Sequence, residues 1–492
     1  MATLSVLTPL RVESLAVGGS NHVVGMGHER ARRAGARLTG RLGADDAVAV
    51  VGVAGALAGD LRTGDLIVAT ELRRTDSDAS FALPGARLLV GELSRARASV
   101  HTGPLVSSTR YVRGRERQAL AVSGAIAVDM ESAWLSASLQ DRPFAVVRAI
   151  SDTANDSHLV GGVRALRSLR SVRGPLERWA AACGTREVLL AAPRSFCAGV
   201  ERAIEIVERA IDRFGPPVYV RRQIVHNAHV VRGLEAKGAV FVEELDEVPN
   251  DAVVVLAAHG VSPTVRRDAD ARSGLMVVDA TCPLVAKVHA EARRYAAQDY
   301  ALVLVGHAEH EEVVGTVGEA PDRFHVVADV DDVATLDLDD DQPVAYLTQT
   351  TLSTDEAAVV VDALRSRFHH LVAPPSDDIC YATQNRQDAV RAIARRCDLM
   401  LVVGSENSSN TARLVELAHK EGCVAKLIED ASQIELGWLA HARTVGLTAG
   451  ASAPEALVQG VIEVLGSLGP VDIDEQAVAH ESVHFGLPLK VR

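Results

Sequence analysis

Residues 188–200 of the chain read VLLAAPRSFCAGV, and they decide how the rest of the sequence is interpreted. The stretch begins as a short buried strand and reaches Cys197, after which apolar residues recur with helical spacing over 201–211. The same order of strand, cysteine and helix occurs at Cys282 and at Cys380. These cysteines lie 85 and 98 residues apart, so the pattern is a degenerate repeat. It predicts three related α/β units about a common centre.

The position of these three cysteines favours metal binding. A helix amino terminus stabilises a thiolate, and parallel sheets bind ligands beyond the carboxyl ends of their strands. Three converging thiolates are a soft ligand set, suited to an iron–sulfur cluster or to zinc. A cluster usually takes four cysteines, so three would leave one iron free for a substrate. Cys183, Cys397 and Cys423 lack this context, and we interpret them as structural.

The composition excludes several classes of protein. The 492 residues are 48% hydrophobic and 23% charged, which indicates a globular chain. A net charge of −13 argues against a general nucleic-acid binder or a polybasic membrane anchor. No apolar run approaches the roughly 18 residues of a membrane span, and the start of the chain is a poor signal peptide. Six cysteines make no disulfide framework at this length, so we expect a cytoplasmic protein.

The organisation of the chain follows from short buried strands that alternate with helical patterns, for example at residues 48–53, 252–256, 301–305 and 399–403. This alternation predicts α/β units with parallel sheets. A basic stretch broken by Gly174-Pro175 marks a boundary near 175–186. We therefore expect a separate α/β domain on each side of this boundary.

Polar side chains follow the other predicted strands. They occur in turns that contain His226, His259, His310, Thr350, Ser408, Ser409, Asn410 and Ser452. Gathered at one face, such hydroxyls, amides, imidazoles and helix N-termini are typical of a diphosphate pocket without a P-loop lysine. Taken singly, each could be an ordinary helix cap or turn residue. Glu312 is a candidate proton donor, and the alternative is a solvated acid at a helix start.

These motifs resemble those of the LytB family of 4-hydroxy-3-methylbut-2-enyl diphosphate reductases, the last enzymes of the non-mevalonate (methylerythritol phosphate) isoprenoid pathway. The resemblance covers about residues 186–487. The matching stretches, in family order, are residues 196–200, 225–227, 258–262, 279–283, 306–316, 348–353, 379–383, 404–410 and 448–454. One departure is Glu311, at a position where the family commonly has proline, and we expect it to be tolerated.

The resemblance implies three α/β units around one [4Fe–4S] cluster per chain, bound by Cys197, Cys282 and Cys380. It places the substrate's terminal hydroxyl on the iron without a cysteine. It assigns the diphosphate to His226, His259, His310, Ser408, Ser409, Asn410 and Ser452, and proton delivery to Glu312 with Thr350. Two electrons, from a ferredoxin or flavodoxin, would then give isopentenyl or dimethylallyl diphosphate.

Residues 1–180 resemble, more weakly, the nucleoside phosphorylase/nucleosidase family. The matching stretches are residues 51–57, 127–133 and 147–152. The resemblance implies that Glu131 holds ribose hydroxyls and that Asp152 protonates the purine leaving group, with Glu13 as a possible water-orienting residue. Because the domain is short for that family, two alternatives stay open: a nucleosidase for an isoprenoid-linked adenosyl compound, or a degenerate scaffold or dimerisation module.

Two rival functions remain for the cysteine-bearing part. One is a non-enzymatic iron–sulfur electron carrier or redox sensor, which would have no use for an anion pocket beside its cluster. The other is a structural zinc site, although the HExxH signature of zinc enzymes is absent from the chain.

Overall fold

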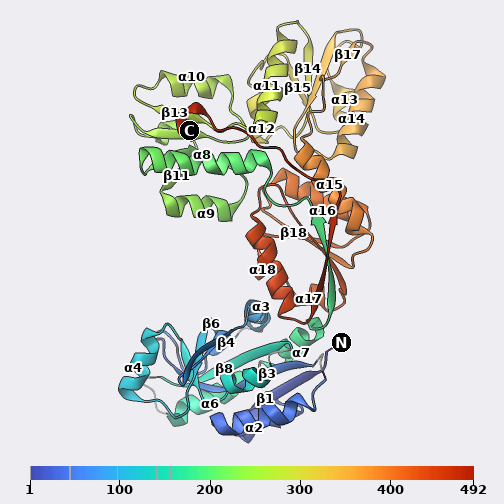
Figure 1. The fold of residues 1–492 in the computed structure, drawn as a ribbon. Coiled ribbons are helices and arrows are strands. Elements are labelled where there is room, and N and C mark those ends of the chain that lie inside the picture. Colours follow the sequence, from blue (N-terminus) through green and yellow to red (C-terminus); the bar gives the residue numbers. More distant parts are fainter. Residues whose placement is uncertain (1, 44–45, 97, 140–141, 154–157) are drawn as a thin grey trace. The chain divides into compact units, whose positions relative to one another are not determined.

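The computed structural model describes residues 2–43, 46–96, 98–139, 142–153 and 158–492 (Figure 1). The chain divides into two compact units. The first contains Met1–Val188, Asp430–Val445 and Gln459–Asp474, and the second contains Leu189–Glu429, Gly446–Val458 and Glu475–Arg492.

The first unit contains an eight-stranded sheet, drawn from blue to teal in Figure 1. Its strands are β1 (Leu4–Thr8), β2 (Asn21–Val23), β3 (Ala47–Ala56), β4 (Leu66–Arg74), β5 (Ser77–Ala82), β6 (Val100–Ser107), β7 (Ala127–Asp129) and β8 (Phe144–Asp152). Its helices are α1 (Arg11–Val17), α2 (His28–Thr39), α3 (Ala86–Arg95), α4 (Gly114–Val122), α5 (Ser132–Leu139), α6 (His158–Leu169) and α7 (Arg173–Ala182).

This sheet is mixed, whereas the sequence pattern predicted a parallel one. Strands β4 and β5 pair antiparallel because only two residues connect them, and so short a connection can only reverse the chain. Strand β8 pairs with both β3 and β4, so that β3, β7, β6, β4 and β8 form a closed ring of pairings. The apolar run of β3 is almost entirely buried in the core of this ring.

Three further sheets follow, in green, yellow and orange-red in Figure 1. The first has the order β11 (Ala239–Val242), β10 (Val218–Arg221), β12 (Val253–Leu256), β13 (Met276–Asp279). The second has the order β15 (Phe324–Val327), β14 (Ala301–Val305), β16 (Val344–Thr348), β17 (Leu371–Val372). The third has the order β19 (Ala425–Ile428), β18 (Leu399–Val403), β20 (Thr444–Ala449), β9 (Arg186–Ala192), β21 (Val471–Ala477).

The pairings within the first two of these sheets are all parallel, as the sequence predicted. Their connections are helical, since parallel strands need a crossover. The helices are α8 (Ala198–Phe214), α9 (Ala228–Lys237), α10 (Pro263–Ala271), α11 (Pro283–Ala296), α12 (Glu311–Val317), α13 (Val330–Thr335), α14 (Thr354–Arg367), α15 (Tyr381–Ala394), α16 (Ser409–Lys420), α17 (Leu436–Leu439) and α18 (Glu455–Gly466). Short 3₁₀ turns occupy Leu245–Glu247, Ala431–Gln433 and Leu489–Val491.

The C-terminal segment 478–492 runs back across the second unit and ends beside β13 (Figure 1). Lys490 Nζ donates to the carbonyl of Val277 at 2.8 Å, and Val491 is buried in the core of the β10–β13 sheet. Arg386 of α15 is fully buried and pairs with Glu481 of the segment at 3.0 Å. No described helix is both long and apolar enough to cross a membrane.

Candidate active site

The three repeat cysteines are N-cap residues: Cys197 precedes α8, Cys282 precedes α11 and Cys380 precedes α15. They line one cavity of about 820 Å³, its open mouth included. Their backbone N–H groups are anchored alike, each on the carbonyl of a distant turn: Ala451 for Cys197 (3.2 Å), Ala258 for Cys282 (2.9 Å) and Thr350 for Cys380 (3.0 Å). Segments far apart in the sequence therefore bring three thiols to one space.

These thiols suit a soft metal group. All three are free cysteines. Burial raises the pKa of Cys282 to about 11 and that of Cys380 to about 12, and the N–H groups of their helices offset this only in part. Gly199 lies between two of them, because a Cβ there would be 2.8 Å from Cys282 Sγ and 3.8 Å from Cys197 Sγ. A bound metal would displace the thiol protons.

The arrangement does not fit a mononuclear zinc site. Within the ranges that the structure describes, no three His, Cys, Asp or Glu side chains lie close enough to hold one metal ion. The three cysteines line one shared cavity. A larger group with one sulfur ligand at each of three corners fits these residues.

Three histidines, His226, His259 and His310, lie together in the lining of the cavity. His226 and His259 stack with ring centroids 4.1 Å apart, and His310 meets their edges at 5.8 and 6.0 Å. Burial and mutual repulsion lower the pKa of His226 to about 3 and that of His310 to about 4. The backbone N–H of Glu312 donates to His310 Nδ1 at 3.2 Å, so the proton of this ring lies on Nε2 and can be donated to a ligand.

Glu311 lies beside these rings. Its carboxylate is 3.5 Å from His259 Nδ1 and 3.5 Å from a guanidinium nitrogen of Arg222. Burial alone would raise the pKa of Glu311, but its contact with His259 and its interactions with the neighbouring His226 and Arg222 lower it to about 2. The residue that departs from the family pattern is therefore an ionised partner of a cavity-lining histidine.

The polar run Ser408-Ser409-Asn410 lies at the start of α16, and all three residues line the cavity. Ser408 is the N-cap and accepts from the backbone N–H of Thr411 at 3.4 Å. Ser452 also lines the cavity and donates to the backbone carbonyl of His226 at 3.0 Å. Among the described residues, neither side-chain polar atom of Asn410 has a hydrogen-bond partner, although both are buried. Such atoms require a ligand or water.

Glu312 and Thr350 are joined by two hydrogen bonds. The backbone N–H of Thr350 donates to Glu312 Oε1 at 2.7 Å, and its hydroxyl donates to Oε2 at 2.9 Å. The carboxyl group is 2% exposed, and burial raises its pKa despite these two bonds. Both residues line the cavity of the thiols. A buried carboxyl whose pKa lies above its usual range can carry a proton to a ligand.

The first unit has a separate cavity of about 600 Å³. Glu131 lines it, accepts from the backbone N–H of Gly27 at 2.7 Å and lies 3.4 Å from Arg148, and burial raises its pKa to about 7. Glu13 also lines it and accepts from the backbone N–H groups of Leu10 (2.6 Å) and Val53 (2.8 Å). The residues selected from the sequence thus face one pocket.

Asp152 lines this pocket too, but its carboxylate is engaged. Arg117 donates to Asp152 Oδ2 at 2.8 Å and to the backbone carbonyl of Asp152 at 2.8 Å. The Ser151 hydroxyl donates to the other carboxylate oxygen at 2.9 Å. Both carboxylate oxygens of Asp152 therefore already have partners within the protein.

Comparison with known proteins assigns the cysteine-bearing part. A family model described as LytB protein matches residues 188–466, more than half of the chain. The chain belongs to the LytB family. A separate model, described as Phosphorylase superfamily, matches residues 13–166. The two resemblances seen in the sequence are thus both confirmed.

Relatives of the LytB region are close. A protein of Cutibacterium acnes named 4-hydroxy-3-methylbut-2-enyl diphosphate reductase is 56% identical over 312 residues, which are 63% of this chain and 96% of the relative. One of the same name from Mycolicibacterium paratuberculosis is 56% identical over 308 residues, covering 62% and 92%. The solved structure of the Plasmodium falciparum reductase matches with a TM-score of 0.60 at 38% identity, covering 63% of this chain and 97% of that one.

Several residues of the two pockets were not among the site residues predicted from the sequence. Phe485 lines the cavity from the C-terminal segment, where no local pattern marks it. Arg117 pairs with Asp152 across 35 residues, and an arginine at that spacing carries no signal. Thr351 lines the cavity and could have been inferred from the polar turn that follows β16.

Proposed function

We propose that this LytB protein is a 4-hydroxy-3-methylbut-2-enyl diphosphate reductase. It removes the allylic hydroxyl of its substrate reductively and yields isopentenyl and dimethylallyl diphosphate, the last step of the non-mevalonate pathway. The observation that carries the proposal is one cavity lined by three free thiols, by neutral hydrogen-bond donors and by the Glu312–Thr350 pair. The relatives that share this name at 56% identity support it.

Cys197, Cys282 and Cys380 would hold one [4Fe–4S] cluster per chain. When bound, this group would pass the two electrons from the external donor to the substrate, one at a time. The similar anchoring of the three cysteines supports three α/β units related by a pseudo-threefold axis. We keep the domain limits of 1–180 and 186–487 as part of the proposal. The free state of all six cysteines supports a reducing, cytoplasmic location. A ferredoxin or flavodoxin is the proposed electron donor.

The remaining residues bind the substrate and move protons. His226, His259, His310, Ser408, Ser409, Asn410 and Ser452 would bind the diphosphate. Glu312, oriented by Thr350, would protonate the departing hydroxyl, so that water leaves instead of hydroxide. In total, two electrons and two protons convert the C–OH group to C–H and water.

The test is anaerobic purification followed by turnover of the allylic diphosphate with a reduced ferredoxin. We expect about four irons and four sulfides per chain and formation of both products. An intact cluster without turnover would support an electron carrier or redox sensor instead. One zinc per chain would refute the cluster assignment.

For the first unit we propose a nucleoside site at the pocket of Glu13, Glu131 and Asp152, with an isoprenoid-linked adenosyl compound as the substrate. Glu131 would hold the ribose hydroxyls, Asp152 would protonate the purine leaving group and Glu13 would orient a water, and all three line this pocket. Release of purine from added nucleosides, lost in Asp152→Asn, is the expected result. Absence of release from every nucleoside tested would favour the alternative, a scaffold or dimerisation module.

A further inference from the structure

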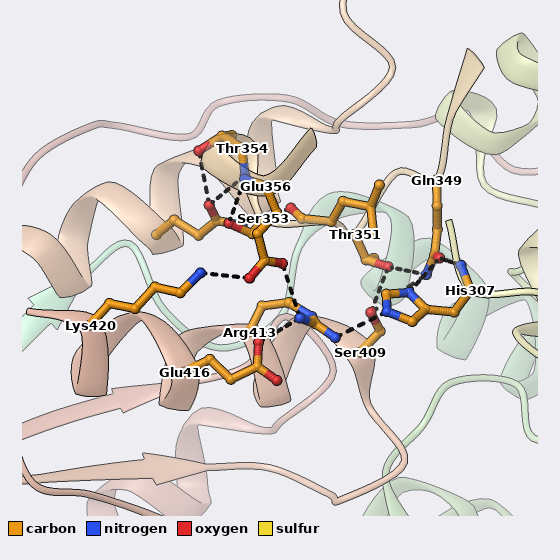
Figure 2. A network of polar contacts seen from close by, with 12 residues as sticks. His307, Gln349, Thr351, Ser353, Thr354, Glu356, Ser409, Arg413, Glu416 and Lys420 are labelled. Carbon is orange, nitrogen blue, oxygen red and sulfur yellow. Dashed lines mark hydrogen bonds and ion pairs between the residues drawn. The ribbon is translucent and has the colours of Figure 1, made fainter. Parts of the chain in front are cut away.

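The cavity proposed for the diphosphate is lined by neutral donors, and no lysine or arginine is among its described lining residues. A hydrogen-bonded chain connects it to one cation. This chain runs through Ser409, Thr351, Gln349 and His307 to Arg413, one turn after Ser409 on α16 (Figure 2). The hydrogen-bond directions along it can be assigned from the chemistry of the groups.

Gln349 fixes the inner half of the chain. It is 1% exposed, and its Oε1 accepts from the backbone N–H of His307 at 3.2 Å. Because a backbone N–H can only donate, the amide NH₂ must face the other way, toward Thr351 Oγ1 at 2.9 Å and Ser409 Oγ at 3.5 Å. Both hydroxyl oxygens therefore accept from Gln349, and the Thr351 hydroxyl donates onward to Ser409 Oγ at 3.2 Å.

Arg413 fixes the outer half. Its Nη2 lies 3.2 Å from His307 Nε2, and a guanidinium can only donate. His307 Nε2 must then accept, which leaves the ring proton on Nδ1, where it faces Gln349 Oε1 at 3.4 Å. Glu356 and Glu416 hold the same guanidinium through Nη1 at 3.1 and 2.5 Å, so Nη2 stays directed at the histidine (Figure 2).

The result is a chain in which every donor hydrogen points inward from Arg413. Ser409 Oγ accepts at its end from Thr351 and Gln349, so its own hydrogen is available for the cavity. A hydroxyl held in this state can only donate to a ligand, which is what an anion requires. Without Arg413, His307 can carry its proton on Nε2, so that the Nδ1 lone pair faces Gln349 Oε1 and the backbone N–H of His307 alone holds the orientation of the amide.

We propose that Arg413 is a positioning residue for anion binding, which acts through His307 and Gln349 to direct the Ser409 hydroxyl at the diphosphate. The inference rests on the proposed function for the identity of the anion. It assigns Arg413 no contact with the substrate.

The experiment compares Arg413→Met with wild type, using the holoenzyme and inorganic diphosphate as the probe in calorimetry. We expect Kd for diphosphate and KM for the allylic diphosphate to rise about tenfold, with kcat changed less than about twofold. Arg413→Lys, which keeps a donor, should recover part of the affinity. The matched control is Lys420→Met, on the same helix and bound to the same Glu356 at 2.6 Å, and it should leave Kd unchanged.

A double-mutant cycle with Ser409→Ala separates positioning from a structural role. If Arg413 acts through Ser409, then Arg413→Met has no further effect on Kd in the Ser409→Ala background. The inference is overturned if the effects of Arg413→Met and Ser409→Ala on Kd are additive. It is also overturned if Arg413→Met lowers affinity, kcat and iron content to the same extent. Wild-type turnover together with unchanged Kd in Arg413→Met overturns the inference alone. If Arg413→Met raises Kd tenfold but the wild-type protein shows no turnover, the proposed function alone is overturned.

Discussion

At the scale of single residues, two hydrogen bonds from Thr350 determine what Glu312 can do. They occupy both carboxylate oxygens and orient the group within the cavity. They also lower its pKa, whereas burial raises it by more. Burial thus favours the protonated carboxyl group of Glu312, whereas the two hydrogen bonds from Thr350 favour the carboxylate.

The substitution Glu312→Gln should keep the shape of the side chain and remove its acidic proton. We expect kcat to fall by at least about 100-fold, because general acid catalysis typically contributes 10²–10⁴-fold. Kd for inorganic diphosphate and the iron content should not change. The control is Glu309→Gln, the same change at an exposed position in the same turn. Wild-type turnover of Glu312→Gln would remove this residue from the proton path.

The buried acids of the first unit predict a pH dependence. The pKa of Glu131 is raised from 4.5 to about 7 by burial, so between these pH values the unfolded chain has lost a proton that the folded unit retains. Stability of the first unit should therefore fall as pH rises from about 4.5 to 7.

All three tryptophans lie in the first unit, at positions 134, 179 and 438, so denaturant unfolding followed by their fluorescence reports this trend. In Glu131→Gln the decline should be smaller. Glu29→Gln, which removes an exposed pair with Arg33, should behave as wild type. A stability that rises over this pH range in the wild type would contradict the assignment.

At the scale of elements, the cysteines depend on how closely the helix ends approach one another. Gly199, in the first turn of α8, leaves space for Cys282 Sγ that a Cβ would occupy. Gly199→Ala should displace that sulfur and lower the iron and sulfide bound per chain by at least half.

Gly233→Ala, in α9, is the matched control, since a Cβ there meets nothing within 4 Å. Metal analysis after anaerobic purification gives the comparison. Full iron content in Gly199→Ala would show that the close approach is not needed to position Cys282.

The arrangement of helices and strands could be predicted from the sequence where the local residue pattern determines the structure. The strand-to-helix placement of Cys197 and Cys282 was predicted, and the helices begin at once after each cysteine, slightly earlier than expected. Cys380 precedes a helix as predicted, but the strand expected directly before it is wrong, since β17 ends at Val372. It did not predict the pairing of β8 with both β3 and β4, because strand partners are chosen by packing over long sequence distances. Phe485 escaped prediction for the same reason. The roles of Glu131 and Asp152 remain predictions.

At the scale of the whole chain, the C-terminal segment connects parts of the second unit that are distant in sequence. Glu481 pairs with Arg386, which is fully buried and also donates to the backbone carbonyls of Ser195 and Phe196 next to Cys197. The Arg386 contacts thus join α15, the turn before α8 and the chain end.

Glu481→Gln should leave the Arg386 charge without its counter-ion and destabilise this region by about 2 kcal/mol, less than the about 3–5 kcal/mol for a fully buried pair. Native-state hydrogen exchange of α15 measures the change. Asp388→Asn, on the same helix in an exposed pair with Arg391, should have little effect. Unaltered exchange in Glu481→Gln would mean that the carbonyls alone satisfy Arg386.

A cavity that offers imidazoles, hydroxyls and an amide, but no cationic side chain among its described lining, has a consequence for how it responds to its surroundings. Attraction between full charges weakens as ionic strength rises, whereas short directional bonds to neutral donors are screened far less. Selectivity for the shape of the anion should thus persist in concentrated salt, where a site made of lysines would lose its ligand.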